Sequence, residues 1–322
     1  YIGGGMGTSG LHNTLEPAIC GVPIIIGKNY SKFSEAKQMI GRTPDEIVAY
    51  RPMKDGVIAD YRVTETMLRY YFKQALGGFN FLKPDVLLSV PAGITSTERR
   101  AVIEAARRAG AKNAYVVKEP ILAAIGAGIS IQQPNGYMIV DIGGGTIDVA
   151  VISLGGIVAS NSVKCAGRRL DDAIIDYIKK TYNLAIGDRT AEKIKIKIAS
   201  AIPLDEELEV LIKGRDYVTG LPRSVKISTN EITKAIDEEL KTMIQAIKDV
   251  LAQVPPELAS DIIDNGITMT GGTSQLRNLT DLIHRRTGVS AYVVEDPLFC
   301  VARGTGIALE HLDTYKKAII SK

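Results

Sequence analysis

The chain has 322 residues, of which 45% are hydrophobic and 23% are charged, a composition typical of a folded globular protein. This length predicts about two domains. The formal net charge is only +3, and positive and negative residues are interspersed along the predicted helices. The charge therefore gives no indication of a nucleic-acid partner.

Cysteine, histidine and hydropathy patterns exclude several other classes of protein. The three cysteines are Cys20, Cys165 and Cys300, and they have no CxxC spacing. This odd number and wide spacing argue against a disulfide framework or structural zinc and favour a reducing compartment. The three histidines form no local metal motif, and no apolar segment approaches the ~20 residues of a membrane-spanning helix. No signal peptide is evident, and the chain begins without Met, so we expect a fragment.

Strands and helices alternate through the first half of the chain, which predicts an α/β fold. Thr95 and Glu98 have the spacing of a capping box and predict the start of a helix that Gly110 ends. The expected elements are strands at 57–63, 84–91 and 114–117, helices at 64–78, 98–110 and 120–130, and a three-stranded meander with glycine turns at 137–163.

The second half continues the same alternation. Ser228 and Glu231 form a second capping-box pattern, which predicts the start of a long helix that Pro255 and Pro256 end. The expected elements are helices at 170–182, 190–201, 227–256 and 301–312, strands at 208–214, 224–228 and 291–297, and a strand, glycine turn and helix at 267–288.

The stretch DIGGGTID places a glycine turn between two strands of the meander. One interpretation is a plain β-hairpin whose glycines supply positive φ. The other is a hairpin whose N–H groups hold phosphates while Asp141 orients a magnesium ion through its water shell. Asp148 is then a second polar anchor or only the exposed face of the strand.

Two further motifs have a structural and a functional interpretation. In GITMTGGTSQLRNL, the turn at Gly271, Gly272 and Thr273 is either a tight strand-to-helix connection or a place where a flat base approaches the backbone. In KEPILAAIGAG, Glu119 is either an acid favoured by the dipole at a helix N-terminus or a carboxylate that orients the water attacking a γ-phosphate.

Taken together and in this order, the three motifs resemble the actin-like ATPase superfamily, and within it the MreB family of bacterial filament proteins. The resemblance runs from about residue 35 to the C-terminus. DIGGGTID alone also resembles DnaK-type chaperone ATPases, but two other stretches are similar to MreB proteins. The motifs that carry the resemblance are RPMKDGVIADY, VPAGITSTERRAV, KEPILAAIGAG, DIGGGTIDVAVISLGGIV, RTAEKIKIKI and GGTSQLRNLTDLI.

The resemblance implies an actin-like α/β fold, with two ribonuclease-H-like domains around a cleft that binds ATP and Mg²⁺. Glu119 and Asp141 would be catalytic, with Asp141 also holding Mg²⁺ through water, and ATP hydrolysis would be coupled to polymerisation. Glu192 and Lys195, at i and i+3, would reach the ribose and base, although a surface ion pair explains the same spacing. The implied nucleotide-binding residues are Gly143, Gly144, Gly145, Thr146, Gly167, Glu192, Lys195, Gly271, Gly272 and Thr273.

Family membership also implies partners and a location. MreB-like proteins polymerise with themselves on the inner face of the membrane, in the cytoplasm, and organise the cell-wall elongation machinery. Phe79, Phe81 and Leu82 in GGFNFLKPD would then be a hydrophobic loop that enters lipid, with Lys73 and Lys83 near headgroups. The alternative is that these apolar residues pack beneath the loop.

The opening stretch differs from the MreB pattern. The first phosphate hairpin expected there is missing, and YIGGGMGTSGLHNTLEP predicts a strand, a turn and a helix instead. Residues 1–40 resemble part of the nucleotide-sugar-binding half of Kdo transferases, which are GT-B glycosyltransferases. The residues that match are Gly10, His12, Asn13 and Glu16. The chain therefore resembles a chimera, and nucleotide affinity is expected to be impaired.

The expected domains follow from these resemblances. They are a transferase-like fragment at 1–40, a partial actin-like domain I at 41–136, a domain II at 137–302 with an insertion at about 171–234, and a C-terminal helix at 303–322 that returns to domain I. Two other functions stay open: a transferase fragment, and a non-catalytic scaffold that docks on MreB filaments. Two departures from the family pattern are the charges of Gly167-Arg168-Arg169 and the turn GGTS in place of three glycines.

Overall fold

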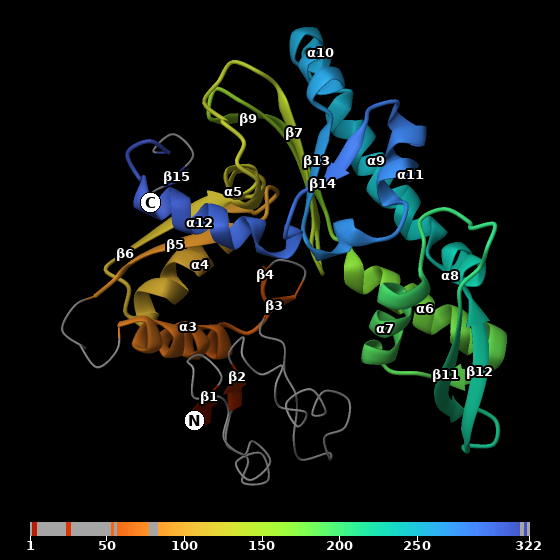
Figure 1. The fold of residues 1–322 in the computed structure, drawn as a ribbon. Helices are drawn as coiled ribbons and strands as arrows, with labels where there is room; N and C mark the ends of the chain where they lie inside the picture. Colours follow the sequence, from red (N-terminus) through yellow and green to blue (C-terminus); the bar gives the residue numbers. More distant parts are fainter. Residues whose placement is uncertain are drawn as a thin grey trace. The chain divides into compact units, whose positions relative to one another are not determined.

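The computed structural model describes residues 57–76 and 83–315 and, outside them, only the backbone of short strands (Figure 1). Those strands are β1 (Ile2–Gly4), β2 (Ile24–Ile26), β3 (Met53–Lys54) and β15 (Ile319–Ile320). Strands β1 and β2 pair in parallel. The chain divides into two compact units: the first holds Tyr1–Lys54, Ile58–Pro84 and Ala105–Lys112, and the second holds Asp55–Val57, Asp85–Glu104 and Asn113–Lys322.

In the first unit, helix α3 (Tyr61–Leu76) begins inside the segment predicted as a strand at 57–63. Only β4 (Val57–Ile58) remains of that strand, so this prediction was wrong. The reason is a local cap, because the Val63 N–H donates to Asp60 Oδ1 at 3.0 Å. A capped first turn outweighs the strand propensity of the segment.

Contacts within the first unit join α3 to the end of α4 (Ser96–Ala109). The Arg108 guanidinium lies 5.5 Å from the centroid of the Tyr61 ring. Arg69 donates to the Arg108 carbonyl at 3.3 Å and forms an ion pair with Glu65 at 2.6 Å.

The second unit is built around a five-stranded sheet with the order β14-β13-β7-β8-β9. The predicted meander is confirmed as three antiparallel strands, and β13 joins β7 in parallel. Both faces of the central strands β7, β8 and β13 are buried, which explains the continuous apolar runs of their sequences. The strands are β7 (Tyr137–Ile142), β8 (Ile147–Ser153), β9 (Gly156–Val163), β13 (Ile267–Thr270) and β14 (Ala291–Val293).

A second sheet of this unit has the order β15-β6-β5, with β5 (Asp85–Val90) and β6 (Asn113–Lys118) in parallel. The capping box that precedes α4 is confirmed, because the Thr95 N–H donates to Glu98 Oε2 at 2.9 Å and the Glu98 N–H donates to Thr95 Oγ1 at 3.2 Å. Strand β6 runs directly into helix α5 (Glu119–Gly126), so that Glu119 follows the end of the sheet.

Helices α5 and α12 (Cys300–Glu310) cross at very close range (Figure 1). A Cβ atom on Gly126 would lie 1.9 Å from the Cys300 carbonyl oxygen, and one on Gly304 would lie 1.9 Å from that of Leu122. Only glycine fits at either position, because the obstructing atoms belong to the opposite backbone. Helix α5 ends at Gly126 rather than at the predicted residue 130.

The rest of the second unit is mainly helical. The predicted helix at 227–256 is wrong, because it is two helices, α8 (Thr229–Ala235) and α9 (Asp237–Leu251), with non-helical torsion angles at Ile236. The capping box at Ser228 is confirmed. A further helix, α10 (Pro256–Asn265), was missed. Pro256 begins that helix, since a proline at a first helical position lacks only an N–H that has no partner there.

The remaining elements complete the second unit. Helices α6 and α7 lie side by side next to the β11–β12 hairpin (Figure 1). Among the described residues, no helix combines the length and the apolar character that crossing a membrane requires. These elements are α6 (Gly167–Tyr182), β10 (Leu184–Ala185), α7 (Asp188–Ile198), β11 (Glu209–Asp216), β12 (Pro222–Ser228), η2 (Gly272–Gln275), α11 (Leu279–Thr287) and η3 (Pro297–Phe299).

Candidate functional site

Three carboxylates converge in the second unit. Asp141 near the end of β7 lies directly opposite Asp148 on β8, so both side chains occupy the same face of the sheet. Glu119 begins α5, and its carboxyl is close enough to both aspartates for their negative charges to raise its pKa. Asp141 is 7% exposed and Asp148 is fully buried. Of the two alternatives for Asp148, the exposed strand face was therefore the wrong one.

Burial makes these acids hard to ionise. It raises the pKa of Glu119 to about 8, with further increases from the Asp148 and Asp141 charges and a lowering by the Ser89 hydroxyl. Burial raises the pKa of Asp141 to about 6, against the lowering by its hydrogen bond from Thr270. The pKa of Asp148 is also raised by burial. Such a cluster favours a bound cation or a proton, and acids perturbed in this way are typical of functional sites.

The polar neighbours of Asp148 are a backbone N–H and two hydroxyls. The Ala92 N–H donates to Asp148 Oδ1 at 2.7 Å, and this hydrogen bond lowers the carboxyl pKa against the effect of burial. The Ser162 and Thr146 hydroxyls also lie close enough to lower the pKa of this carboxyl, although neither makes a hydrogen bond of normal geometry to the buried Oδ2 in the part of the chain that the structure describes. These polar neighbours offset only part of the cost of burying the carboxylate, because the pKa of Asp148 is still raised.

The glycine hairpin between β7 and β8 is held from outside. Gly143 donates to the Thr146 carbonyl at 3.0 Å, while Gly167 donates to the Gly143 carbonyl at 3.2 Å and Arg168 to the Gly144 carbonyl at 2.8 Å. Neither Gly143 nor Gly144 has a φ in the left-handed region, so the interpretation based on positive φ fails at these two positions. A Cβ on Gly144 would meet open space, which leaves its backbone accessible.

The turn after β13 contacts the same hairpin. Gly271 has a φ of +83°, and a Cβ there would lie 2.3 Å from the Ile142 carbonyl oxygen and 2.9 Å from Asp141 Oδ1. The Thr273 hydroxyl donates to the Gly143 carbonyl at 2.8 Å. The turn is therefore a tight connection, as one interpretation holds, and it also borders the carboxylate cluster. Gly272 lies against the Leu298 side chain.

Lys195 reaches the start of α6 from α7. Its ammonium donates to the Gly167 carbonyl at 2.7 Å and forms an ion pair with Asp171 at 2.8 Å. The surface ion pair with Glu192 was therefore the wrong alternative, because Lys195 is mostly buried and pairs with α6 instead. Glu192 is exposed on α7. Burial is the main cause that raises the pKa of Asp171, and the nearby Glu192 charge raises it further.

Most of the described candidates thus form one connected set, to which Glu119 and Glu192 are related only through charge. Close contacts and hydrogen bonds join Asp141 to the turn at Gly271, that turn to the glycine hairpin, and the hairpin through Gly167 to Lys195. Sequence reasoning missed Thr270, Ser89 and Asp171 as partners. The polar end of the apolar strand ITMT was the signal for Thr270. The candidates outside the described residues are Gly10, His12, Asn13, Glu16, Phe79, Phe81 and Leu82.

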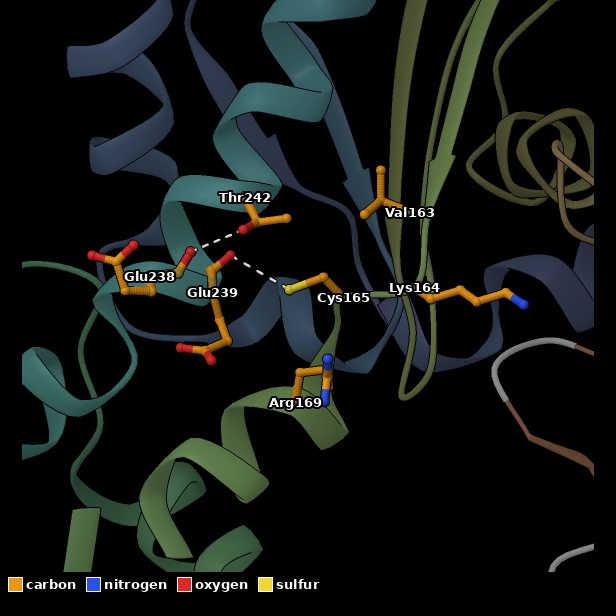
Figure 2. Close-up of a pocket in the computed structure, with 7 residues that line it drawn as sticks. All are labelled: Val163, Lys164, Cys165, Arg169, Glu238, Glu239 and Thr242. Atoms are coloured by element: carbon orange, nitrogen blue, oxygen red, sulfur yellow. Dashed lines mark hydrogen bonds between the residues drawn. The ribbon is translucent and has the colours of Figure 1, made fainter. Parts of the chain in front are cut away.

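A separate cavity of about 350 Å³ lies where β9 and the start of α6 meet α9 (Figure 2). Its lining includes Arg169, one of the two charges noted as a departure from the family pattern, so that charge contributes to this cavity. The Cys165 thiol lies in the wall and donates to the Glu239 carbonyl at 3.6 Å. The lining residues are Val163, Lys164, Cys165, Arg169, Glu238, Glu239 and Thr242.

Comparison with known proteins identifies relatives over most of the chain. The family model described as MreB/Mbl protein matches residues 15–317. The cell shape-determining protein Mbl of Bacillus subtilis is 47% identical over 306 residues, which cover 95% of this chain and 92% of that protein. The cell shape-determining protein MreB of Escherichia coli is 49% identical over 290 residues, which cover 89% and 83%.

Solved structures agree with this relationship. The crystal structure of MreB 5 of Spiroplasma citri bound to AMPPNP has a TM-score of 0.83 at 38% identity, covering 91% of this chain and 86% of that one. A MamK double helical filament has a TM-score of 0.73 at 23% identity, covering 93% and 89%, and shows likeness of fold alone. The transferase resemblance of residues 1–40 finds no support, since the family match already begins at residue 15. The fold is the actin-like ATPase fold, and the chain belongs to the MreB/Mbl family.

Proposed function

We propose that this chain binds ATP with Mg²⁺ at the carboxylate cluster and assembles into filaments that determine cell shape. The observation that carries the proposal is the set of three carboxylates, in which Asp141 and Asp148 are buried, Glu119 is partly buried, and the turn at Gly271 lies against Asp141. The relatives named as cell shape-determining proteins, and a Spiroplasma citri relative crystallised with ADP and with AMPPNP, support it.

The donor set fits a hydrated magnesium ion. Mg²⁺ binds oxygen ligands and usually takes one or two carboxylates, and the raised pKa values of Glu119 and Asp141 show that nearby positive charge would stabilise the ionised cluster. Asp141 and Asp148 would hold the water shell of the ion, which neutralises phosphate charge when bound. Glu119, at the start of α5, would orient the attacking water and accept its proton at the carboxylate, which a cation bound at the cluster would keep ionised by lowering its raised pKa.

The backbone and Lys195 would bind the rest of the nucleotide. The open space beside Gly144 would admit phosphate oxygens, with Gly145 and Thr146 completing the hairpin. Gly271, Gly272 and Thr273 would border the adenosine with Gly167. Lys195 would reach the ribose and base with Glu192, and we propose that Asp171 holds the ammonium in place.

A fluorescent ATP analogue tests nucleotide binding. We expect Mg²⁺-dependent binding by the wild-type chain and a loss of about tenfold or more in Asp141→Asn, because a neutral amide attracts the hydrated cation less strongly. Asp237→Asn changes an exposed acid on α9 and serves as the matched control. Absence of Mg²⁺-dependent binding in the wild type would refute the proposal.

Impaired affinity belongs to the same experiment. The first phosphate hairpin was expected to be missing, in a region outside the described residues. We infer from the sequence that nucleotide affinity is reduced, and tight Mg²⁺-dependent binding by the wild type would contradict this inference.

The two alternative functions have their own tests. Nucleotide binding without turnover, combined with co-polymerisation on MreB filaments, would favour a non-catalytic scaffold. Only measurable sugar transfer from CMP-Kdo would support the transferase function, which no observation favours.

Membrane association and partners complete the proposal. We infer that filaments lie on the inner face of the membrane in the cytoplasm and contact the cell-wall elongation machinery, as the MreB resemblance implies. The expected division into actin-like domains I and II is part of the same inference. Replacing Phe81 and Leu82 with Ser should abolish co-sedimentation with liposomes while leaving the fold intact. Unchanged sedimentation would contradict the membrane loop.

A further inference from the structure

Thr270 makes a buried hydrogen bond to the carboxylate cluster. It is the last residue of β13, it is fully buried, and it lies in register opposite Asp141 on β7. Its hydroxyl donates to Asp141 Oδ1 at 2.7 Å. Hydrogen bonds to an ionised acceptor are about twice as strong as neutral ones. This contact therefore joins the end of β13 to the acid proposed to hold Mg²⁺.

The environment of Oδ1 leaves the two oxygens of Asp141 unequal. Oδ1 is enclosed by the Thr270 hydroxyl and by the backbone at Gly271, where a Cβ atom would lie only 2.9 Å away. The hydrogen bond fixes the rotation of the carboxylate about its last torsion angle, which is otherwise broad. With Oδ1 occupied in this way, Oδ2 is the oxygen left to accept from a metal-bound water.

A second threonine on the same strand separates this role from general packing. Thr268 lies two residues earlier, is 3% exposed, and its hydroxyl shares a hydrogen bond of 2.7 Å with the Tyr292 hydroxyl. Thr268 and Thr270 therefore share strand, strand face, burial and a side-chain hydrogen bond. They differ in the partner, because only the bond from Thr270 ends on a member of the carboxylate cluster.

We propose that Thr270 is a positioning residue for Asp141, which it locks in the orientation that Mg²⁺-dependent nucleotide binding requires. Thr270 acts through Asp141 and needs no contact of its own with the nucleotide. The inference rests on the proposed function, since it assigns a role within that site. It predicts that one buried hydroxyl controls the Mg²⁺ dependence of the protein.

The test compares Thr270→Val with Thr268→Val and Thr270→Ser. Both valine variants keep a β-branched side chain of similar size, and the serine keeps the hydroxyl. The readouts are the Mg²⁺ concentration for half-maximal binding of a fluorescent ATP analogue and the melting temperature of the nucleotide-free protein. We expect Thr270→Val to need about tenfold more Mg²⁺ or higher, the fold change that losing one hydrogen bond to a charged group produces. Thr270→Ser should restore the wild-type value, and Thr268→Val should leave it unchanged.

The outcomes distinguish this inference from the proposed function. Wild-type binding together with an unchanged Mg²⁺ requirement in Thr270→Val overturns the inference alone. An equal increase in Thr268→Val also overturns it, because the effect would then come from the strand. No binding by the wild type overturns both. Should Thr270→Val fail to fold, Thr270→Ala and Thr270→Ser differ by a single hydroxyl, and equal Mg²⁺ requirements in that pair overturn the inference.

Discussion

The crossing of α5 and α12 supports a sharp prediction about Gly304. In Gly304→Ala the new Cβ would lie 1.9 Å from the Leu122 carbonyl oxygen and 2.9 Å from the Gly126 nitrogen, whereas ordinary contacts begin at 3.4 Å. The obstructing atoms belong to the backbone of α5, so no side-chain rotation relieves the overlap. One helix must shift, which costs about 1–3 kcal/mol or more in an otherwise well-packed interior.

Gly306 on the same helix is the matched control. A Cβ there meets nothing within 4 Å, so Gly306→Ala should gain the helix propensity of alanine and stabilise the protein by about 0.5–1 kcal/mol. Gly304→Ala gains the same helix propensity, but this gain is smaller than the free-energy cost of its steric overlap. We therefore expect the two variants to change the free energy of unfolding in opposite directions, with a difference equal to the overlap cost of about 1–3 kcal/mol or more.

Urea denaturation followed by circular dichroism measures both variants. Leu122 lies one helical turn after Glu119, so a displaced α5 should also move the Glu119 carboxylate and, if the proposed function holds, slow ATP hydrolysis in Gly304→Ala. Equal stability of the two alanine variants would refute the reasoning, because it would mean that the close crossing is not maintained in solution.

Three further predictions concern acids, caps and ion pairs. Because the pKa of Glu119 is about 8 in the fold and 4.5 is its ordinary value, the folded state binds more protons between these limits and loses stability as the pH rises. At pH 8, nucleotide-free Glu119→Gln should therefore have a free energy of unfolding higher than that of the wild type by on the order of 2 kcal/mol, and a higher melting temperature. At pH 5 the stability of the variant should approach that of the wild type. Ser228→Ala should lose about 1 kcal/mol of unfolding free energy through the capping box, while Ser228→Asn should retain most of it. Lys195→Ala should lose about 2–3 kcal/mol and weaken ATP binding, because it leaves Asp171 buried without its counter-ion, and exposed Lys193→Ala should change little.

Each of these predictions has a contradicting result. A melting difference for Glu119→Gln that is constant from pH 5 to pH 8 would mean that its carboxylate does not titrate in this window. Equal unfolding by the alanine and asparagine variants of Ser228 would argue against the cap. Equal stability of the Lys195 and Lys193 variants would mean that the buried ion pair is not formed in solution.

Local signals in the sequence were sufficient for much of the fold. The meander at 137–163 and both capping boxes were predicted because each depends on residues only a few positions apart. The same reasoning failed where a local cue competed with another. The Asp60 cap overrode a strand pattern, and Pro256 began a helix after the proline pair that was expected only to end one.

The candidate site shows the same division. Glu119, Asp141 and the two glycine turns were found from the sequence because their motifs are continuous stretches. The spacing of Glu192 and Lys195 suggested a local ion pair, but α6 packs against α7 and supplies Asp171 instead. Partners that come from distant segments have no signature in a single sequence, because only packing brings them together.

The sequence by itself therefore determined the family, the motifs and most elements of this protein. The tertiary structure alone decided that β13 pairs in parallel with β7, which places Thr270 on Asp141. It also decided that Gly126 and Gly304 permit the backbones of α5 and α12 to touch. The physical reason is that strand register and helix crossing depend on which surfaces become buried together, whereas caps and turns depend on neighbours along the chain.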